Sequence, residues 1–267
     1  MPKVSVIMGT YNGEKTLDAA IQSICDQTFT DWEFIICDDC STDGTWEKIL
    51  KWEKKDSRIK GVRNSQNMKI AASSNRCIAL AEGSYIAKMD DDDVSYSTRL
   101  EKQVQFLEQH PDIAFVSSLV DCYDGEKIVK NHFDRKAEPQ KEDFLSGTQF
   151  VNPGLMIRRE CLERVNGYRV EKRTRRTEDY DLFMRLYAEG YKGYNIQERL
   201  LRYFVNPEAM KKKRKYRYRI DEAQVRFEGF KALGLLPKGI LYVFRPLVVG
   251  LIPHQLIWKW KYKKGRL

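Results

Sequence analysis

Short apolar runs alternate with segments of helical spacing through residues 4–89, and this alternation restricts the fold more than any other feature of the sequence. Residues 4–8 and 32–37 have the pattern of buried strands, and residues 17–25 carry their apolar side chains at helical spacing. The alternation continues with a strand, a helix and a further strand, at residues 59–63, 71–81 and 85–89. Repeated units of this kind predict an α/β fold with a doubly wound, mostly parallel sheet.

Three of the most polar loops of the sequence follow expected strands. They comprise residues 10–14, 38–45 and 90–93. In doubly wound sheets, ligands bind beyond the carboxyl ends of the strands. We therefore expect these loops to meet at one edge of the sheet and to form a binding site.

The last of these loops contains four consecutive aspartates, Asp90 to Asp93. Their mutual repulsion would disfavour leaving all four ionised without a cation nearby. Because side chains alternate along an extended backbone, we expect Asp90 and Asp92 on one face and Asp91 and Asp93 on the other. One face could then hold a divalent ion that completes its coordination with water and phosphate oxygens. An acidic surface turn without a metal is the alternative.

The composition is that of a folded protein. Of the 267 residues, 42% are hydrophobic and 12% aromatic, which suffices for the core of one large domain or of a domain with an appendage. Six cysteines are scattered through the expected core segments and no signal peptide precedes the first strand, so we expect a reducing, cytoplasmic setting. Two aspartates between Cys37 and Cys40 argue against redox chemistry, and three histidines are too few to suggest a zinc site.

The second half of the chain is less regular. Residues 113–120 are expected to form another strand, and residues 150–157 a loop that enters a strand. Residues 177–186 begin a helix that ends near Gly190, with Glu178 and Asp179 in its first turn. The helix dipole favours anions there, so these two acids could cap the helix or could serve chemistry.

Four segments of the chain, taken in order, resemble glycosyltransferase family 2. They are VSVIMGTYN at residues 4–12, DDCSTDGT at 38–45, GSYIAKMDDDDV at 83–94 and TEDYDLFMRL at 177–186. The resemblance covers about the first 205 residues and implies a GT-A fold. In this fold a Rossmann-like, nucleotide-sugar-binding half (residues 1–120) would be joined to an acceptor-binding half (residues 121–205).

The resemblance also implies roles for individual residues in donor binding. Thr10, Tyr11 and Asn12 would belong to the nucleotide pocket, with Tyr11 stacked on the base; a core aromatic at a strand end is the alternative for Tyr11. Asp39 would accept a hydrogen bond from N3 of uracil, which a carboxylate can do. Asp38 is the next choice for this contact, and either aspartate could instead cap the following helix.

The same resemblance implies a metal site and a catalytic base. Asp90 and Asp92 correspond to the DxD motif of the family, and we expect Asp92 to be the principal ligand of Mn²⁺ or Mg²⁺. Asp90 would share the ion or orient the ribose, and Asp91 would belong to the donor-binding residues. Glu178 and Asp179 resemble the ED motif, whose carboxylate removes the proton of the acceptor hydroxyl; we expect Asp179 to be this base.

The chain departs from the family pattern in residues 67–75. A glycine is usual at the position of Lys69, and an arginine often stands at the position of Ser74. Asn67 could still reach the base, and Arg76 could replace the missing charge. An arginine on a helix surface is the alternative for Arg76.

The net charge of +9 is concentrated at the C-terminus, because residues 210–267 contain 16 Lys and Arg against 3 Asp and Glu. We expect residues 206–267 to form a basic, amphipathic helical extension. The apolar run at residues 240–258 is interrupted by prolines and an arginine, so it would not cross a bilayer. Basic and aromatic residues around Trp258 and Trp260 suit an anionic membrane surface. The alternative is a helix that packs on the catalytic domain or on a second subunit of a homo-oligomer.

Together these features predict an inverting, metal-dependent glycosyltransferase of the hexosyl or N-acetylhexosaminyl class. It would move a sugar from a UDP-sugar to a lipid-linked saccharide in cell-surface polysaccharide synthesis, on the inner face of the cell membrane. Nucleic-acid binding through the basic run at residues 211–219 is a second hypothesis. It would leave both acidic motifs without a role, so no nucleic-acid partner is expected. A noncatalytic relative that binds nucleotide sugar without transfer is the third, and the intact acidic motifs disfavour it.

Overall fold

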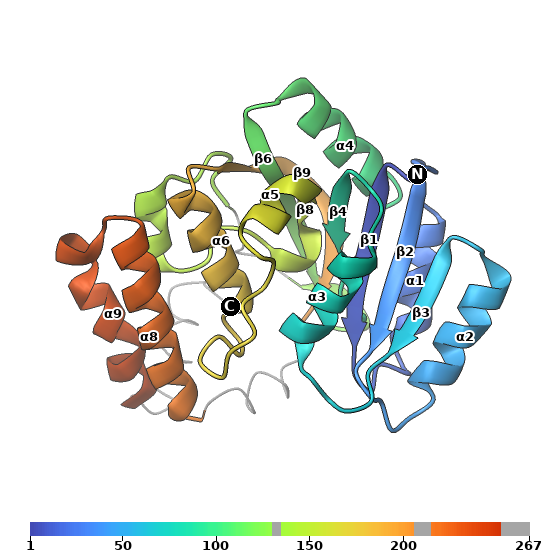
Figure 1. Cartoon of the computed structure of the whole chain (residues 1–267), viewed down its shortest axis with the longest axis horizontal. Coiled ribbons are helices and arrows are strands. Elements are labelled where there is room, and N and C mark those ends of the chain that lie inside the picture. Colours follow the sequence, from blue (N-terminus) through green and yellow to red (C-terminus); the bar gives the residue numbers. More distant parts are fainter. Residues whose placement is uncertain (130–134, 206–214, 252–267) are drawn as a thin grey trace.

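The computed structural model describes residues 1–129, 135–205 and 215–251, and it confirms the α/β fold (Figure 1). The first strands are β1 (Val4–Thr10), β2 (Trp32–Asp38), β3 (Ile59–Arg63) and β4 (Tyr85–Lys88). The later strands are β5 (Val94–Ser95), β6 (Ile113–Tyr123), β7 (Ile128–Val129), β8 (Met156–Arg158) and β9 (Lys192–Phe204). Within the described residues they form one sheet of nine strands in the order β3-β2-β1-β4-β8-β6-β9-β5, with β7 paired to β6.

The sheet divides into a parallel part and a mixed part. Strands β1 to β4 pair with one another in parallel, as the sequence predicts. Beyond β4, β8 runs antiparallel to both β4 and β6, while β6 and β9 are parallel to each other. Parallel neighbours need a crossover connection, and the chain from β6 to β9 makes one through two helices. Between β6 and its antiparallel neighbour β8, the described residues contain β7 and two short 3₁₀ turns.

Helices cover both faces of the sheet, which is the doubly wound arrangement. One face packs against α1 (Leu17–Cys25), α2 (Thr45–Lys55) and α4 (Arg99–Gln109). The other packs against α3 (Ile70–Leu80), α5 (Arg159–Arg164) and α6 (Glu178–Ala188). Because side chains alternate along a strand, Val6 and Met8 of β1 join the first core cluster and Ile7 joins the second.

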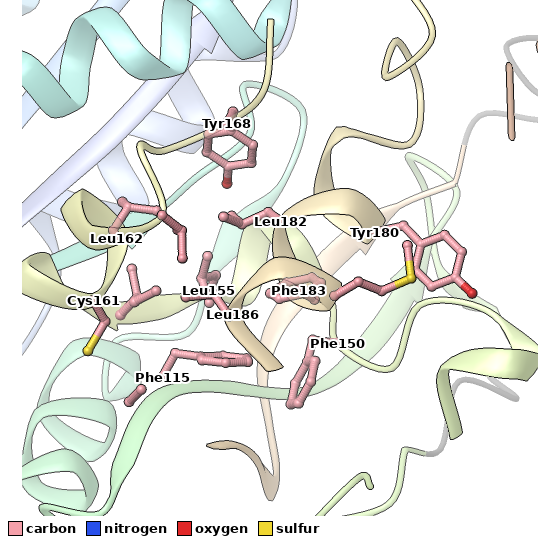
Figure 2. Close-up of a cluster of buried hydrophobic side chains, with 14 of the residues drawn as sticks. Phe115, Phe150, Leu155, Cys161, Leu162, Tyr168, Tyr180, Leu182, Phe183 and Leu186 are labelled. Carbon is pink, nitrogen blue, oxygen red and sulfur yellow. The ribbon is translucent and has the colours of Figure 1, made fainter. Parts of the chain in front are cut away.

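The second core cluster holds α6 in place. Phe115 of β6 packs against Phe183 of α6 and Phe150, with ring centroids 5.5 Å and 4.8 Å apart (Figure 2). The hydroxyl of Tyr180 donates to the carbonyl of Phe144 in the 3₁₀ turn η1 (Lys141–Ser146). Aromatic rings of this size contribute large buried areas, so α6 has a fixed position relative to the sheet.

Of the two C-terminal helices, α8 (Arg217–Ala232) packs against α6, and α9 (Leu236–Leu251) packs against α8 and the turn η1 (Figure 1). Phe230 and Val243 are buried in the same core cluster as α6. A Cβ at Gly229 would lie 2.3 Å from Sδ of Met184, so the glycine allows α8 to approach α6 closely. In its described part the basic extension is therefore a packed helical pair. The rest of it, residues 206–214 and 252–267, lies outside the described residues.

Candidate active site

The three polar loops meet at the carboxyl edge of β1, β2 and β4, as predicted. The hydroxyl of Thr10 donates to the carboxylate of Asp91, which joins the first and third loops. The N–H of Asn12 donates to Oγ of Ser41 at 2.9 Å, which joins the first and second. A Cβ at Gly13 would lie 2.3 Å from Oδ2 of Asp91, so the glycine is needed for this close approach.

A small cavity of about 270 Å³ lies between these loops. Six of the predicted residues form its wall: Thr10, Tyr11, Asp39, Asp90, Asp91 and Asp92. Tyr11 is 48% exposed, so it is not a core aromatic and its ring is accessible to a ligand. The structure therefore brings together most of the predicted donor-binding residues.

Asp38, Asn12 and Asn67 do not line the small cavity. Asp38 is fully buried, pairs with Nε of Arg63 at 2.9 Å and accepts the N–H of Ser41. Oδ1 of Asn12 accepts the N–H of Thr42 at 2.9 Å, so this side chain holds the second loop in place. These contacts give Asp38 and Asn12 structural roles, and that of Asp38 is an ion pair and a loop contact rather than the helix cap offered as its alternative.

Asp39 lines the small cavity and also fixes the loop before α3. Its carboxylate accepts the backbone N–H groups of Met68 and Lys69, at 2.7 Å and 2.8 Å, and Nδ2 of Asn64 at 2.8 Å. Lys69 has φ 75° and ψ 164°, a conformation that glycine adopts far more readily than lysine. A lysine thus stands in a backbone conformation that suits glycine, the residue that the family resemblance leads us to expect here. Arg76 donates to Oδ1 of Asn64 at 2.7 Å and supports the same loop, rather than lining the cavity.

The four aspartates do not alternate as expected. Strand β4 ends at Lys88, so a turn and not an extended backbone carries them, and Asp90, Asp91 and Asp92 line one cavity. Asp93 is buried on the other side of the turn, where its carboxylate accepts the N–H of Phe204 from β9 at 2.8 Å. The expectation that Asp90 and Asp92 would share a face without Asp91 is wrong, because the strand is shorter than its apolar pattern.

Two buried cations offset part of the charge of this cluster. The ammonium group of Lys88 pairs with the carboxylate of Asp90, and Arg99, which is fully buried, donates to Oγ of Ser95 at 2.8 Å. Burial lowers the pKa of Arg99 to about 10, and the nearby Asp93 and Asp90 act in the opposite direction. Neither cation was singled out from the sequence, since buried Lys and Arg follow no local pattern.

The pKa values of two cavity carboxyls, those of Asp91 and Asp92, are nevertheless raised. Loss of hydration, followed by the charges of Asp90 and Asp91, raises the pKa of Asp92 to about 7, although its side chain still reaches solvent. Burial is also the main cause that raises the pKa of Asp91, and the hydrogen bond from Thr10 opposes it. A cluster with raised carboxyl pKa values gains stability when a cation binds to it.

A second, larger cavity of about 770 Å³ adjoins the first, since Asp90 and Ile70 belong to the walls of both. Glu178 and Asp179, in the first turn of α6, line it. Burial, followed by the charge of Asp179, raises the pKa of Glu178 to about 7. Oδ1 of Asp179 accepts the N–H of Tyr180 at 2.7 Å. The two predicted acidic motifs therefore line adjoining cavities.

Comparisons with known proteins agree with this geometry. The family model described as Glycosyl transferase family 2 matches residues 5–165. The chain belongs to glycosyltransferase family 2. It is 39% identical over 264 residues to the putative glycosyltransferase EpsE of Bacillus subtilis, covering 98% of this chain and 94% of EpsE. It is 30% identical over 195 residues to WfaP of Escherichia coli, a UDP-Glc:α-D-GlcNAc-diphosphoundecaprenol β-1,3-glucosyltransferase, covering 73% of this chain and 74% of WfaP.

Solved structures show the same fold. TarS of S. aureus, in complex with UDP-GlcNAc, superposes with a TM-score of 0.73 at 19% identity, covering 91% of this chain and 73% of that one. The mannosyltransferase PcManGT of Pyrobaculum calidifontis, in complex with GDP-Man and Mn²⁺, gives a TM-score of 0.63 at 19% identity, covering 93% of this chain and 68% of that one. This family 2 glycosyltransferase thus has the GT-A fold that its sequence implies.

The oxygen atoms around the small cavity suit a hard divalent cation. In the described residues, no three side chains of His, Cys, Asp or Glu converge closely enough to hold a metal by themselves. Three neighbouring carboxylates, of Asp90, Asp91 and Asp92, nevertheless border the cavity, and each can offer oxygen atoms to a cation. This fits a glycosyltransferase in which one or two carboxylates and the donor's phosphates hold the ion together.

The larger cavity contains basic residues that, apart from Lys69, were not singled out from the sequence. Its wall includes Lys69, Arg135, Lys172, Arg175 and Arg176, alongside the acidic pair of the glycosyltransferase. The only signal in the sequence is the position of Arg175 and Arg176, directly before the segment that resembles the ED motif.

Proposed function

We propose that this glycosyltransferase is an inverting, metal-dependent enzyme that moves a sugar from a UDP-sugar to a hydroxyl of a lipid-linked saccharide. The observation that carries the proposal is Asp90, which lies in the wall of both cavities. The small cavity has the groups expected to hold a nucleotide and its diphosphate, and the larger one has the acidic pair. A sugar joined to the diphosphate would therefore lie between the two, next to a bound acceptor.

In the proposed reaction, Asp179 is the base that accepts the proton of the acceptor hydroxyl. Burial, together with the charge of Asp179, raises the pKa of Glu178 to about 7, which favours its protonated form near neutral pH, so we assign the role of proton acceptor to Asp179. Its carboxylate takes the proton of the acceptor hydroxyl, whose oxygen forms a bond to the anomeric carbon. The bond from that carbon to the diphosphate breaks with its electron pair, so UDP leaves and the anomeric configuration is inverted.

The carboxylates of the small cavity have a matching role. Asp92, together with Asp90, would hold Mn²⁺ or Mg²⁺, and such an ion supplies positive charge that stabilises the diphosphate as a leaving group. Tyr11 and Asp39 would contact the base. Mn²⁺ in the structure of PcManGT supports the use of a divalent metal in this fold.

A lipid-linked acceptor and a bacterial surface polysaccharide are supported by the relatives. WfaP acts on a diphosphoundecaprenol-linked sugar, and the neighbouring TarS structure contains UDP-GlcNAc. The test is a screen of nucleotide sugars for Mn²⁺-dependent hydrolysis, which needs no acceptor. We expect one or a few UDP-sugars to be hydrolysed. Hydrolysis of GDP-sugars alone, or of none in the presence of either metal, would contradict the proposal.

We further propose that the enzyme works at the inner surface of the cell membrane. None of the described helices is long and apolar enough to cross a bilayer. Helix α9 exposes apolar side chains at a spacing of three and four residues, which puts them on one face: Leu241, Phe244, Val248 and Leu251. An exposed apolar stripe of this kind, in a basic extension, suits the interface of an anionic membrane.

Leu241→Glu tests this proposal, because Leu241 is 79% exposed and the substitution should not disturb the core. We expect weaker co-sedimentation with phosphatidylglycerol vesicles and an unchanged rate of UDP-sugar hydrolysis. The matched control is Ile128→Glu, which alters another exposed apolar residue, on β7. Equal vesicle binding by the wild type and both variants would contradict the membrane proposal. The apolar stripe of α9 would then be a surface for other contacts.

A further inference from the structure

The loop that leads into α6 contains basic residues of two kinds. Arg169 and Arg173 are held by acids: Arg169 pairs with Asp181 at 3.3 Å and with Glu228 of α8 at 3.0 Å, and Arg173 pairs with Glu228 and with Glu171 at 2.6 Å. This network fixes the loop between α6 and α8. These two arginines therefore have a structural role.

Lys172, Arg175 and Arg176 differ, because they line the larger cavity. Among the residues that the structure describes, none of the three forms an ion pair with a carboxylate, in contrast to their neighbours in the same loop. Their charges are therefore available to a ligand. Cations with many hydrogen-bond donors, gathered in a concave wall, are the usual means of binding phosphate.

The backbone and a ring fix the direction of Arg176. Its φ is 73°, a left-handed conformation that non-glycine residues rarely adopt. Its guanidinium carbon lies 4.8 Å from the ring centroid of Tyr218 on α8, and Tyr218 also lines the larger cavity. A ring contact orients the guanidinium without neutralising its charge. Strained conformations held by their surroundings are common at ligand sites.

Position along the chain links these cations to the reacting hydroxyl. Arg175 and Arg176 precede Glu178 and Asp179 by only a few residues, and all four line the same cavity. An anion at the arginines would thus lie close to the acceptor hydroxyl at Asp179. The donor's own diphosphate is expected on the other side of Asp90, at the carboxylates of the small cavity.

We infer that Arg175 and Arg176, assisted by Lys172, bind the diphosphate of a lipid-linked acceptor. The inference rests on the proposed function and adds a subsite to it. In an acceptor such as that of WfaP, the sugar that receives the new bond is joined directly to the diphosphate, so only one sugar ring separates the phosphates from the reacting hydroxyl. The arrangement of the arginines and the acidic pair matches that order. The lipid would then leave the cavity past Tyr218, toward α8 and α9.

The test uses the full-length protein with its donor site filled by saturating UDP and Mn²⁺. Geranyl diphosphate is then titrated in a calorimeter, as a probe with a diphosphate and a lipid but no sugar. We expect the double variant Arg175→Gln/Arg176→Gln to bind the probe at least about tenfold more weakly, because two charge-assisted contacts are lost. Its affinity for UDP should change less than about twofold.

Two further variants make the result specific. Arg164→Gln on α5 removes an exposed arginine that lines neither cavity, and it should bind the probe as the wild type does. Arg175→Lys/Arg176→Lys keeps the charge and should recover part of the affinity. Recovery by lysine, with thermal unfolding temperatures near that of the wild type, would separate lost contacts from lost folding.

Each other outcome contradicts the inference in a recognisable way. An equal loss of UDP affinity in the double variant would assign the arginines to the donor's diphosphate. Unchanged binding of geranyl diphosphate would remove them from any phosphate site. A parallel loss of binding to phosphatidylglycerol vesicles would assign them to membrane phospholipid. Failure of the wild-type protein to bind UDP at all would contradict the proposed function itself, before the second titration begins.

Discussion

The two halves of the active site are built in different ways. On the nucleotide side, the residues of the small cavity follow the ends of adjacent parallel strands, and Asp39 N–H to Thr10 O at 2.8 Å extends the strand pairing into the loops. On the acceptor side, Glu178 and Asp179 depend on α6, which aromatic packing and an ion-pair network hold in place. The first half is thus positioned by strand pairing, together with hydrogen bonds between its loops, and the second by the packing and ion pairs of α6. Substitutions should affect the two halves separately.

The largest expected effect is on turnover. Asp179→Asn should lower kcat by at least about 10²-fold, because an amide cannot accept the proton of the acceptor hydroxyl. UDP affinity, measured by calorimetry, should stay within about twofold, since the small cavity is built by other strands. Glu178→Gln should lower kcat less. If Glu178→Gln is the more damaging change, the assignment within the pair is reversed.

Asp92→Asn should act on the other half. UDP binding by the wild type should require a divalent metal, and the variant should lose about tenfold or more of its affinity in Mn²⁺ because an anionic ligand is gone. Its affinity without metal should match that of the wild type without metal. The measurement is calorimetry of UDP binding by the wild type and by the variant, each with and without Mn²⁺. A variant that keeps metal-dependent binding would place the ion on Asp90 and Asp91 instead.

The pKa of Glu178 gives a prediction for stability. Its folded-state pKa is raised from 4.5 to about 7, so the folded state loses stability relative to the unfolded state as the pH rises between those values. Glu178→Gln removes this cost. We expect the variant to be more stable than the wild type at pH 8, by on the order of 2 kcal/mol, and to show little difference at pH 4. Thermal unfolding at both values is the measurement, and equal stability at pH 8 would show that the carboxylate is well solvated.

The smallest expected effect concerns the loop before α3, whose residue Lys69 lines the larger cavity. Lys69→Gly should stabilise the protein by about 1 kcal/mol, since glycine adopts φ 75° without strain. The control is Lys54→Gly in α2, an exposed lysine in a helix, which should destabilise by about the same amount. Chemical denaturation compares the two. If Lys69→Gly destabilises the protein, contacts of the lysine side chain, for example at the larger cavity, contribute more stability than its backbone strain costs.

The sequence was most informative where function is carried by short contiguous segments. The strands β1, β2 and β4, the helix α6 and six residues of the small cavity lie where the periodicity, the turn residues and the family resemblance put them. The sequence was least informative about which side chains pair with one another in the folded protein. Asp38 and Asp39 are adjacent and chemically identical, yet Asp38 pairs with Arg63 while Asp39 lines the cavity, because their side chains point to opposite sides of the chain.

Sequence alone determined the family, the α/β alternation and the position of both acidic motifs, because each depends on residues close together in the chain. Only the tertiary structure decided which charges are already neutralised. Lys88 and Arg99 are buried beside the aspartates, and Arg173 is paired with Glu228 of α8, whereas no ion pair is seen for Arg175 in the described part of the chain. Ion pairs form between groups that are distant in sequence and depend on packing, so no local pattern could distinguish the structural arginines from those that face the cavity.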